Sequence, residues 1–185
     1  SHKLILAGDL GATNFRVALF RVMDGRRGTL KRLRSDRLPS TSFNSFHQAV
    51  KAFLDKEEIP GTIVTACFGV PGPNIGGVVH ATNLNWLIDE SALPGLIGIP
   101  RVAILNDLEA TAFGVGELRH SDFLLLQAGA GSRAGNQCVI APGTGLGEAG
   151  LFWDAERQQH LPWASEGGHA DFAPTDDIQA SLLEF

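Results

Sequence analysis

The 185 residues of this chain are enough for one large domain, or for one complete domain and part of a second. Hydrophobic residues make up 44% and charged residues 19%, and the mean hydropathy is near zero, which excludes a disordered or membrane-embedded chain. The formal charge of −5 argues against a nucleic-acid surface, and no apolar run approaches the ~20 residues of a membrane span. We therefore expect a cytoplasmic protein without nucleic-acid or membrane partners.

The start of the chain predicts an antiparallel meander followed by a helix. Strand patterns cover residues 4–9, 15–23 and 29–38, and short turns rich in glycine and polar residues join them. In the next segment, "TSFNSFHQAVKAFLDKEEIPG", apolar residues recur at helical spacing. Thr41 or Ser42 is the expected start of this helix, and Pro60 and Gly61 mark its end.

Further strands and helices are predicted up to about residue 117. The stretches "TIVTACFGVPGP", "GGVVHATN" and "RVAILND" have the pattern of strands, and "LEATAFGVGELRH" has the pattern of a helix. A meander, a crossover helix and further strand and helix units together indicate an α/β domain over residues 3–117.

The pattern then starts again over residues 118–185. "DFLLLQAG", "QCVIAP" and "EAGLFWD" predict strands, and "APTDDIQASLLEF" predicts a helix with Thr175 or Asp176 as its N-cap. The order strand, glycine turn, strand occurs at "ILAGDLGATNFRVALF" and again at "VIAPGTGLGEAGLFW", which hints at two related domains facing a shared site. Because the last helix has no C-cap signal, we expect the second domain to be incomplete in this chain.

The cysteines and basic residues show no pattern of a metal or nucleic-acid site. Cys67 and Cys138 lie in apolar runs, without Cys or His at ligand spacing, and are interpreted as buried reduced thiols. One basic run is interpreted as a solvated edge hairpin, since Lys and Arg discourage pairing between sheet edges. It comprises Arg26, Arg27, Lys31, Arg32, Arg34 and Arg37.

Two glycine-rich turns between strands are candidates for binding phosphate. Free backbone N–H groups at a tight turn can form a concave anion site, and both "GDLGATN" and "PGTGLG" have the small residues that this requires. Neither is a dinucleotide fingerprint or a Walker loop, because a strand follows each turn. Thr13 and Thr144 add hydroxyls that could bind phosphate oxygens. Ordinary hairpins without a ligand are the alternative.

Acidic residues follow two of the buried strands. Asp9 would repel a phosphate unless a cation lay between them, which suggests Mg²⁺ near Asp9; the alternative is an Asp that caps the turn. Asn106 and Asp107 follow "RVAIL" at a strand carboxyl end, where α/β folds bind ligands. For Asp107 the alternative is a helix N-cap. Glu109 is interpreted as an acid in the first turn of the helix, where the helix dipole stabilises a negative charge.

A fourth polar cluster is "SEGGHADFAP". Glu166 and His169 flank two glycines, so both side chains can leave one turn and converge on a single ligand. Their acceptor and donor groups suit a polyhydroxylated molecule. The other histidines in the domain are interpreted as structural or solvent-facing: His47, His80, His120 and His160.

Taken in order, the stretches "GDLGATN", "TNLNW", "LNDLEA", "APGTGLG" and "EGGHADFAP" resemble the bacterial ATP-dependent glucokinase family of the hexokinase/actin-like ATPase superfamily. The resemblance runs from Lys3 to the end of the chain, and "EGGHADFAP" is its most specific part. It implies an α/β, RNase H-like (actin-like ATPase) fold with two domains around a cleft. The second domain, over residues 118–185, would be truncated.

The resemblance also implies roles for individual residues. Asp107 would be the general base, and Asn106, Glu166 and His169 would hold the sugar hydroxyls together with Asp107; Asn83 is a further residue on the sugar side. The cofactors implied are ATP and Mg²⁺, with Asp9 as the metal residue, through water. The implied contacts to the ATP phosphates are Gly8, Asp9, Gly11, Ala12, Thr13, Asn14, Gly143, Thr144 and Gly145.

The family's adenosine-binding segment and another sugar-binding acid lie beyond residue 185, so we expect the chain alone to be inactive. The resemblance implies that the intact protein is an enzyme and a homodimer. One alternative is a sugar kinase or sugar-sensing regulator of the ROK family, although "ADFAPTDD" lacks that family's cysteines and no helix-turn-helix precedes the first strand. Another alternative is an actin-like filament or chaperone ATPase, in which Asp107, Glu166 and His169 would have no evident role.

Overall fold

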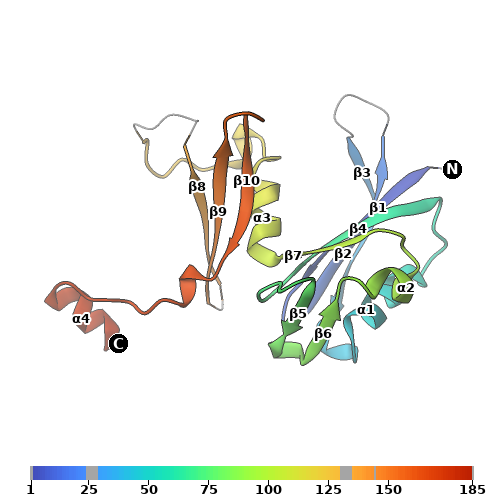
Figure 1. Cartoon of the computed structure of the whole chain (residues 1–185), viewed down its shortest axis with the longest axis horizontal. Coiled ribbons are helices and arrows are strands. Elements are labelled where there is room, and N and C mark those ends of the chain that lie inside the picture. Colours follow the sequence, from blue (N-terminus) through green and yellow to red (C-terminus); the bar gives the residue numbers. More distant parts are fainter. Residues whose placement is uncertain (1, 24–28, 130–134, 144, 185) are drawn as a thin grey trace.

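The computed structural model describes residues 2–23, 29–129, 135–143 and 145–184, which form a mixed α/β fold (Figure 1). A five-stranded sheet has the order β3-β2-β1-β4-β7; β1, β2 and β3 are antiparallel, and β4 and β7 run parallel to β1. The meander predicted from the sequence is confirmed. The strands are β1 (Lys3–Leu10), β2 (Asn14–Val22), β3 (Leu30–Pro39), β4 (Thr62–Val70) and β7 (Val102–Asn106).

One face of this sheet packs against α1 (Phe46–Leu54) in a continuous apolar core. The ring of Phe46 lies 5.5 Å from that of Phe15 and 5.0 Å from that of Phe68, both nearly edge-to-face, which is a favoured aromatic geometry. The buried residues that β1, β2 and β4 contribute are Leu4, Leu6, Leu10, Phe15, Val17, Leu19, Ala66, Phe68 and Val70. Their alternation along each strand follows from the two-residue period of β structure.

Helix α1 starts later than the sequence predicts. Thr41 and Ser42 belong to a short 3₁₀ turn, η1 (Ser40–Ser42), and the N-cap position is Ser45. The chain must first leave β3 and turn toward the core, so the helix begins where Phe46 can be buried. It ends at Leu54, before Pro60.

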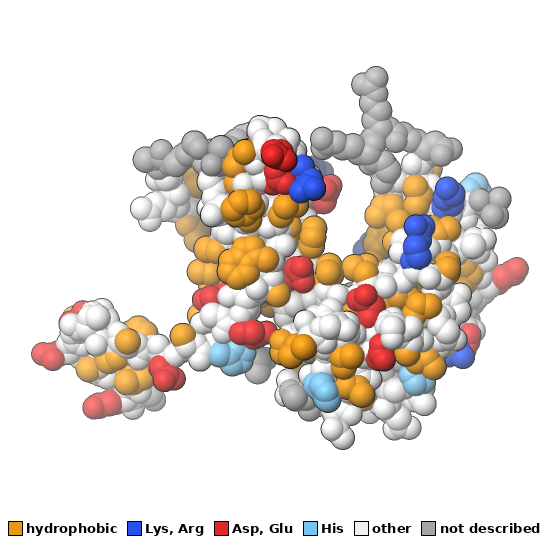
Figure 2. Space-filling model, in the orientation of Figure 1, with side chains coloured by type: hydrophobic (Ala, Val, Ile, Leu, Met, Phe, Trp, Pro, Cys, Tyr) orange, Lys and Arg blue, Asp and Glu red, His pale blue; other side chains and the backbone are white. Residues whose placement is uncertain are grey.

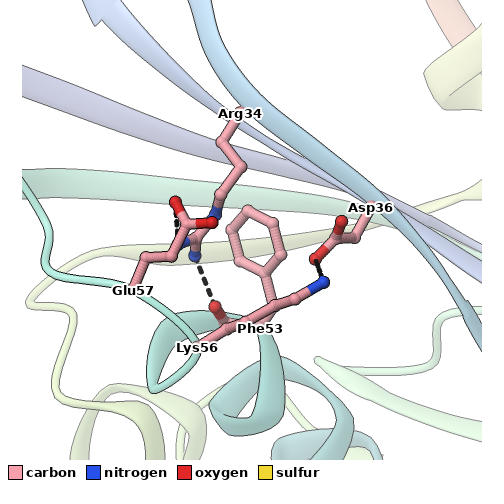
Figure 3. A network of polar contacts seen from close by, with 5 residues as sticks. All are labelled: Arg34, Asp36, Phe53, Lys56 and Glu57. Carbon is pink, nitrogen blue, oxygen red and sulfur yellow. Dashed lines mark hydrogen bonds and ion pairs between the residues drawn. The ribbon is translucent and has the colours of Figure 1, made fainter.

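Strand β3 is an edge strand, as the basic run predicts, with Lys31, Arg32 and Arg37 exposed. Arg26 and Arg27 lie outside the described residues. Arg34 is the exception to a solvated basic face, because it is largely buried against α1 (Figure 3).

Polar contacts tie β3 to the end of α1 (Figure 3). The Arg34 guanidinium lies over the Phe53 ring, 4.1 Å from its centroid, and donates hydrogen bonds to the Phe53 carbonyl and to Glu57. Lys56 Nζ lies 3.0 Å from Asp36 Oδ2. A cation over an aromatic face and at a helix C-terminus is doubly favourable, so Arg34 stabilises the packing of the helix on the sheet.

The opposite edge of the sheet, β7, is covered by side chains. The Ile104 N–H donates to Glu90 Oε2 at 2.7 Å, and the Ile104 carbonyl accepts from Asn74 Nδ2 at 2.9 Å. Both come from the connection between β4 and β7, which holds β5 (Val78–Ala81), η2 (Thr82–Leu84), β6 (Trp86–Asp89) and α2 (Leu93–Ile97). These side chains replace the hydrogen bonds that a further strand would make.

Helix α3 (Asp107–Val115) follows β7 and contacts strands of a second, antiparallel sheet (Figure 1). The order of this sheet is β10-β9-β8, with β8 (Gln137–Pro142), β9 (Leu146–Asp154) and β10 (Gln159–Ser165). Its buried cluster consists of Ala112, Ala149 and Leu151, packed against Leu108 and Val139. The chain continues through η4 (Gly167–His169) to α4 (Asp177–Leu183), whose N-cap is Asp176, one of the two residues predicted.

The strand predicted at "DFLLLQAG" is wrong. A 3₁₀ turn, η3 (His120–Asp122), opens this stretch, and residues 123–129 form no strand. Leu124 and Leu126 are 84% and 89% exposed. Apolar composition favours a strand only where a neighbouring strand accepts its backbone hydrogen bonds, and this segment pairs with no described strand.

The interpretation of both cysteines as buried is correct only in part. Cys67 on β4 is half-buried, and burial raises the pKa of its thiol, with the charges of Glu90 and Glu109 adding to the effect. Cys138 is exposed because it lies on β8, an edge strand whose outer face is uncovered in the described part of the chain.

Candidate functional site

Polar residues gather where β1 and β7 end. Both strands run parallel to β4, which lies between them, so their carboxyl ends meet at one edge of the sheet. Asp9 lies near the end of β1, and Asn106 is the last residue of β7. This is the edge at which open α/β sheets bind ligands.

Asn106, rather than Asp107, is the N-cap of α3. Its side-chain oxygen accepts from the N–H groups of Leu108 at 3.0 Å and Glu109 at 3.3 Å, and its Nδ2 donates to the Gly72 carbonyl at 3.2 Å. Asn106 is also buried. Because Asn106 occupies the N-cap position, the N-cap alternative for Asp107 is wrong. The Asn106 side chain also holds the loop at Gly72, so it fixes both the helix start and this loop in place.

Asp107 is the first residue of α3, and its carboxylate is half-buried. Burial raises the pKa of this carboxyl above its usual range; the hydrogen bond from the Leu108 N–H opposes the shift, and the charges of Asp9 and Glu166 add to it. Acids from two other elements therefore act on Asp107. None of them is adjacent in sequence, so only the fold brings them together.

Gly69 on β4 allows α3 to begin this close to the sheet. A Cβ added at Gly69 would lie 3.1 Å from Ala110 Cβ and 3.5 Å from Asp107 Cα. Gly69 also pairs with Asp9 in the parallel register. Gly69 was not predicted from the sequence; its signal is a glycine inside an otherwise buried strand, which marks a close backbone approach.

The turn between β1 and β2 is tight, and hydrogen bonds from Ser40, which follows β3, stabilise it. Gly11 N–H donates to the Asn14 carbonyl at 2.9 Å, and Ala12 and Thr13 are exposed. Ser40, fully buried, donates its hydroxyl to the Gly11 carbonyl at 2.8 Å and its N–H to the Thr13 carbonyl at 3.0 Å. Ser40 was not found from the sequence, because a serine after a strand gives no signal that it reaches a turn 29 residues away.

The glycine at position 8 is explained by the core. A Cβ there would lie 2.7 Å from Phe15 Cε2 and 2.8 Å from Phe68 Cδ1, inside the aromatic cluster. A contact of Gly8 with phosphate stays a prediction. The neighbouring Asp9 points to the other face, where its carboxylate lies 3.3 Å from Arg16 Nη1 and both side chains are more than half exposed.

The other predicted site residues lie mainly on the second sheet. Gly143 N–H donates to the Gly145 carbonyl at 2.9 Å in the turn between β8 and β9, and Thr144 lies outside the described residues. Glu166 and His169 do meet: Glu166 Oε2 lies 3.3 Å from His169 Nδ1, and the His169 N–H donates to the Glu166 carbonyl at 3.1 Å. Both side chains are exposed.

Asn83 is an exposed residue of η2, and within the described residues no hydrogen bond or ion pair joins it to Asp107, Glu166 or His169. Its place on the sugar side stays a prediction. The described residues also hold no group of three or more His, Cys, Asp or Glu side chains arranged to bind a metal. A search of their helices found none that is long and apolar enough to span a membrane.

The fold is that of hexokinase-type sugar kinases. The ROK hexokinase from Thermus thermophilus shares it with a TM-score of 0.54 over 92% of this chain and 54% of its own, at 18% identity, which shows the fold alone. The chain belongs to the glucokinase family, because the family model described as Glucokinase matches residues 6–185.

Relatives in this family cover nearly the whole chain. Glucokinases from Nostoc sp. and Marinobacter nauticus are 34% and 33% identical over 98% and 96% of the chain. The crystal structure of a glucokinase from an Antarctic psychrotroph is 32% identical in sequence and has a TM-score of 0.78. The match covers 98% of this chain and 55% of the other. The chain spans 52% and 53% of the two relatives, about half their length.

Proposed function

We propose that the intact protein is a glucokinase, which transfers the γ-phosphoryl group of ATP to the 6-hydroxyl of glucose. The observation that carries the proposal is the position of Asp107, which begins α3 against Gly69, the strand partner of Asp9, in a chain of the glucokinase family. A base and a group for the phosphate side would thereby share one site, and the charge of Glu166, on the proposed sugar side, also acts on Asp107. The glucokinase from Balamuthia mandrillaris, crystallised in complex with glucose, shares the fold with a TM-score of 0.73 at 24% identity.

The fold proposed for the intact protein is the RNase H-like, actin-like ATPase type. The order β3-β2-β1-β4-β7, with a meander followed by two parallel strands, supports it. Residues 3–117 would form the small domain, and residues 118–185 the first part of the larger domain. The intact enzyme would be a cytoplasmic homodimer, and the 185-residue chain by itself would be inactive.

Glucose would lie between the two sheets. Glu166 and His169 offer a carboxylate and an imidazole from one turn, and both are exposed and therefore accessible to a ligand. Asn106 has one side-chain N–H left beyond its bond to Gly72, which suits one sugar oxygen. Asn83 would contribute from η2.

The phosphates of ATP would bind at the two turns, residues 8–14 and 143–145. A carboxylate is the ligand type that Mg²⁺ prefers, and the Asp9 carboxylate is exposed and accessible, so it fits a water-mediated role. Its partner Arg16 is no obstacle, because an exposed ion pair is worth only ~0–1 kcal/mol. When bound, Mg²⁺ would neutralise charge on the phosphate oxygens.

Asp107 would accept the proton of the 6-hydroxyl as that oxygen attacks the γ-phosphorus. Burial, with the charges of Asp9 and Glu166, raises the pKa of its carboxyl, and a raised pKa makes the carboxylate a stronger base. The cap by Asn106 and the hydrogen bond from Leu108 hold the carboxylate in one orientation. Burial between the two sheets limits water, the competing nucleophile.

Substitution of Asp107 tests the proposal. In the intact protein, Asp107→Asn should lower kcat by about 10²–10⁴-fold with a much smaller change in the KM for glucose, because the amide keeps the contacts but not the base. A coupled assay of glucose 6-phosphate formation measures both constants.

The control for this experiment is Glu109→Gln, an equally conservative change in the same helical turn, which should keep near-normal kcat. Glu166→Gln should chiefly raise the KM for glucose. Normal turnover of Asp107→Asn would refute Asp107 as the base, and wild-type protein that phosphorylates no hexose would refute the function.

A further inference from the structure

Four hydrogen bonds form a closed ring between β7 and the connection that follows β4. We call its four residues the polar ring: Asn74, Gly77, Glu90 and Ile104. Ile104 donates its N–H to Glu90 Oε2 at 2.7 Å, and Glu90 donates its own N–H to the Gly77 carbonyl at 2.9 Å. Gly77 donates its N–H to Asn74 Oδ1 at 2.9 Å, and Asn74 Nδ2 donates to the Ile104 carbonyl at 2.9 Å. Because Ile104 is buried in the core, the ring is anchored on the sheet.

The polar ring fastens a short turn, residues 71–77, to β7. Ile75 and Val78 exchange backbone hydrogen bonds at 3.0 and 3.2 Å. Between them lie Gly76 and Gly77, whose φ angles are +62° and +86°. Positive φ at both central positions is the geometry of a type I′ turn, which glycine adopts without strain. The segment therefore has a defined shape as well as a fixed attachment.

The same segment is attached to β7 a second time, at the proposed site. Asn106, two residues after Ile104, donates from Nδ2 to the Gly72 carbonyl at 3.2 Å, while its Oδ1 accepts from two N–H groups in the first turn of α3. Gly72 has a φ of +104°, and a Cβ there would lie 3.3 Å from the His80 carbonyl, so this position favours glycine. One N–H of the Asn106 amide is left, and the place of the Gly72 carbonyl sets its direction.

We propose that Asn74 and Glu90 are positioning residues for the sugar. Through the polar ring they fix the Gly72 carbonyl, which aims the remaining N–H of Asn106 at one sugar oxygen. The inference rests on the proposed function and adds to its sugar side two residues that act through Asn106.

The proposed base is held by other contacts. Asp107 accepts from the Leu108 N–H on α3, and α3 begins against Gly69 on β4. Loss of the polar ring should therefore weaken sugar binding and leave the chemical step nearly unchanged. Such a change appears in KM and not in kcat.

The test is the KM for glucose and the kcat of the intact protein in the coupled assay, with the Kd of glucose from calorimetry as a second readout. Glu90→Ala and Asn74→Ala should each raise KM and Kd about 3–10-fold, the effect of one hydrogen bond, with kcat within about 2-fold of the wild type. Glu90→Gln should keep a near-normal KM, because its amide oxygen still accepts from the Ile104 N–H. If Glu90→Ala does not fold, Asn74→Ala serves, since Asn74 is exposed.

A double-mutant cycle tests whether the ring acts through Asn106. Asn106→Ser keeps a preferred N-cap side chain but has no amide to reach Gly72. In this background Glu90→Ala should raise KM by less than about 2-fold. The matched control is Ala at the neighbouring acid, Asp89→Ala; the Asp89 carboxylate lies outside the ring and accepts from Ser91 Oγ at 2.7 Å and from its N–H at 2.9 Å, so KM should stay at the wild-type value.

Three results would overturn the inference: an unchanged KM in both Glu90→Ala and Asn74→Ala, a Glu90→Gln variant as weak as Glu90→Ala, or a full effect of Glu90→Ala in the Asn106→Ser background. Phosphorylation of glucose by the wild type in any of these cases would leave the proposed function intact. Wild-type protein without that activity refutes the function itself, so the two failures are distinguishable.

Discussion

Residues 3–117 and 118–185 differ in how they are packed. The first region contains the large core around the Phe15, Phe46 and Phe68 rings. The second region has a small buried cluster, and one of its three members, Ala112, belongs to α3 of the first region. Asn106 therefore ends a strand of the large core, and α3, which begins at Asp107, packs with the small cluster, whereas Glu166 and His169 lie in an exposed turn after the second sheet.

The surface of the second region is correspondingly apolar (Figure 2). Its exposed large apolar residues come from the 118–126 stretch, from the strands, from the segment before α4 and from α4: Leu118, Phe123, Leu124, Leu125, Leu126, Ile140, Leu146, Phe152, Trp163, Phe172, Ile178, Leu182 and Leu183. Patches of this kind mark surfaces that bind other protein segments. The comparison teaches that the first region buries most of its large apolar residues in its own core, whereas the described part of the second region leaves many of them exposed.

The largest expected difference between the regions is in core truncation. Phe68→Ala should reduce the free energy of unfolding by about 3–5 kcal/mol, because a fully buried ring leaves a cavity between Phe15 and Phe46. Leu151→Ala in the second cluster should cost about 2 kcal/mol, the lower end for such a change, since few buried residues surround it. Urea unfolding followed by circular dichroism measures both values, and equal costs would break the comparison.

A smaller difference is expected for two serines that support turns. Ser40→Ala should cost about 1–3 kcal/mol, because the fully buried Ser40 hydroxyl is lost and the part-buried Gly11 carbonyl is left without its partner. Ser165→Ala removes a hydrogen bond from the exposed Gly167 N–H, which water can replace, and should cost about 0.5 kcal/mol or less. Thermal unfolding of the two variants is the measurement, and a costlier Ser165→Ala would contradict the ranking.

The smallest expected effect is on the pH dependence of stability and concerns Asp107, on the helix that packs against the second region. The folded state raises the pKa of Asp107, so it binds this proton more tightly than the unfolded chain does. Stability contributed by this group is therefore lost as the pH rises from the ordinary carboxyl pKa through the raised one. Asp107→Asn should be more stable than the wild type at pH 7, and the gain should vanish in acid below the ordinary carboxyl pKa. Unfolding midpoints at both pH values test this, and a gain that grows in acid would refute it.

The meander and its glycine turns could be predicted from the sequence because their signals are local. Apolar alternation, tight-turn residues and the Asp176 cap each depend on a few neighbouring residues, and each is confirmed. The edge position of β3 followed from its charges. The glucokinase family followed from ordered motifs, and the family model matches it.

Other features could not be predicted, because they depend on partners distant in the chain. "DFLLLQAG" has the composition of a strand but pairs with no described strand. Asn106, and not Asp107, is the N-cap of α3, and its side chain also donates a hydrogen bond to the distant Gly72 carbonyl. Arg34 has the sequence pattern of a solvated charge and lies instead on Phe53.

The sequence by itself determined which residue types stand after which strands, since backbone geometry and apolar periodicity act over a few residues. Only the tertiary structure decided that the charges of Asp9 and Glu166 add to the burial that raises the pKa of Asp107. It also decided that Gly8 serves an aromatic core while Gly147 and Gly168 serve contacts between elements. The physical reason is that packing and electrostatics depend on distance in space, which a linear pattern does not contain.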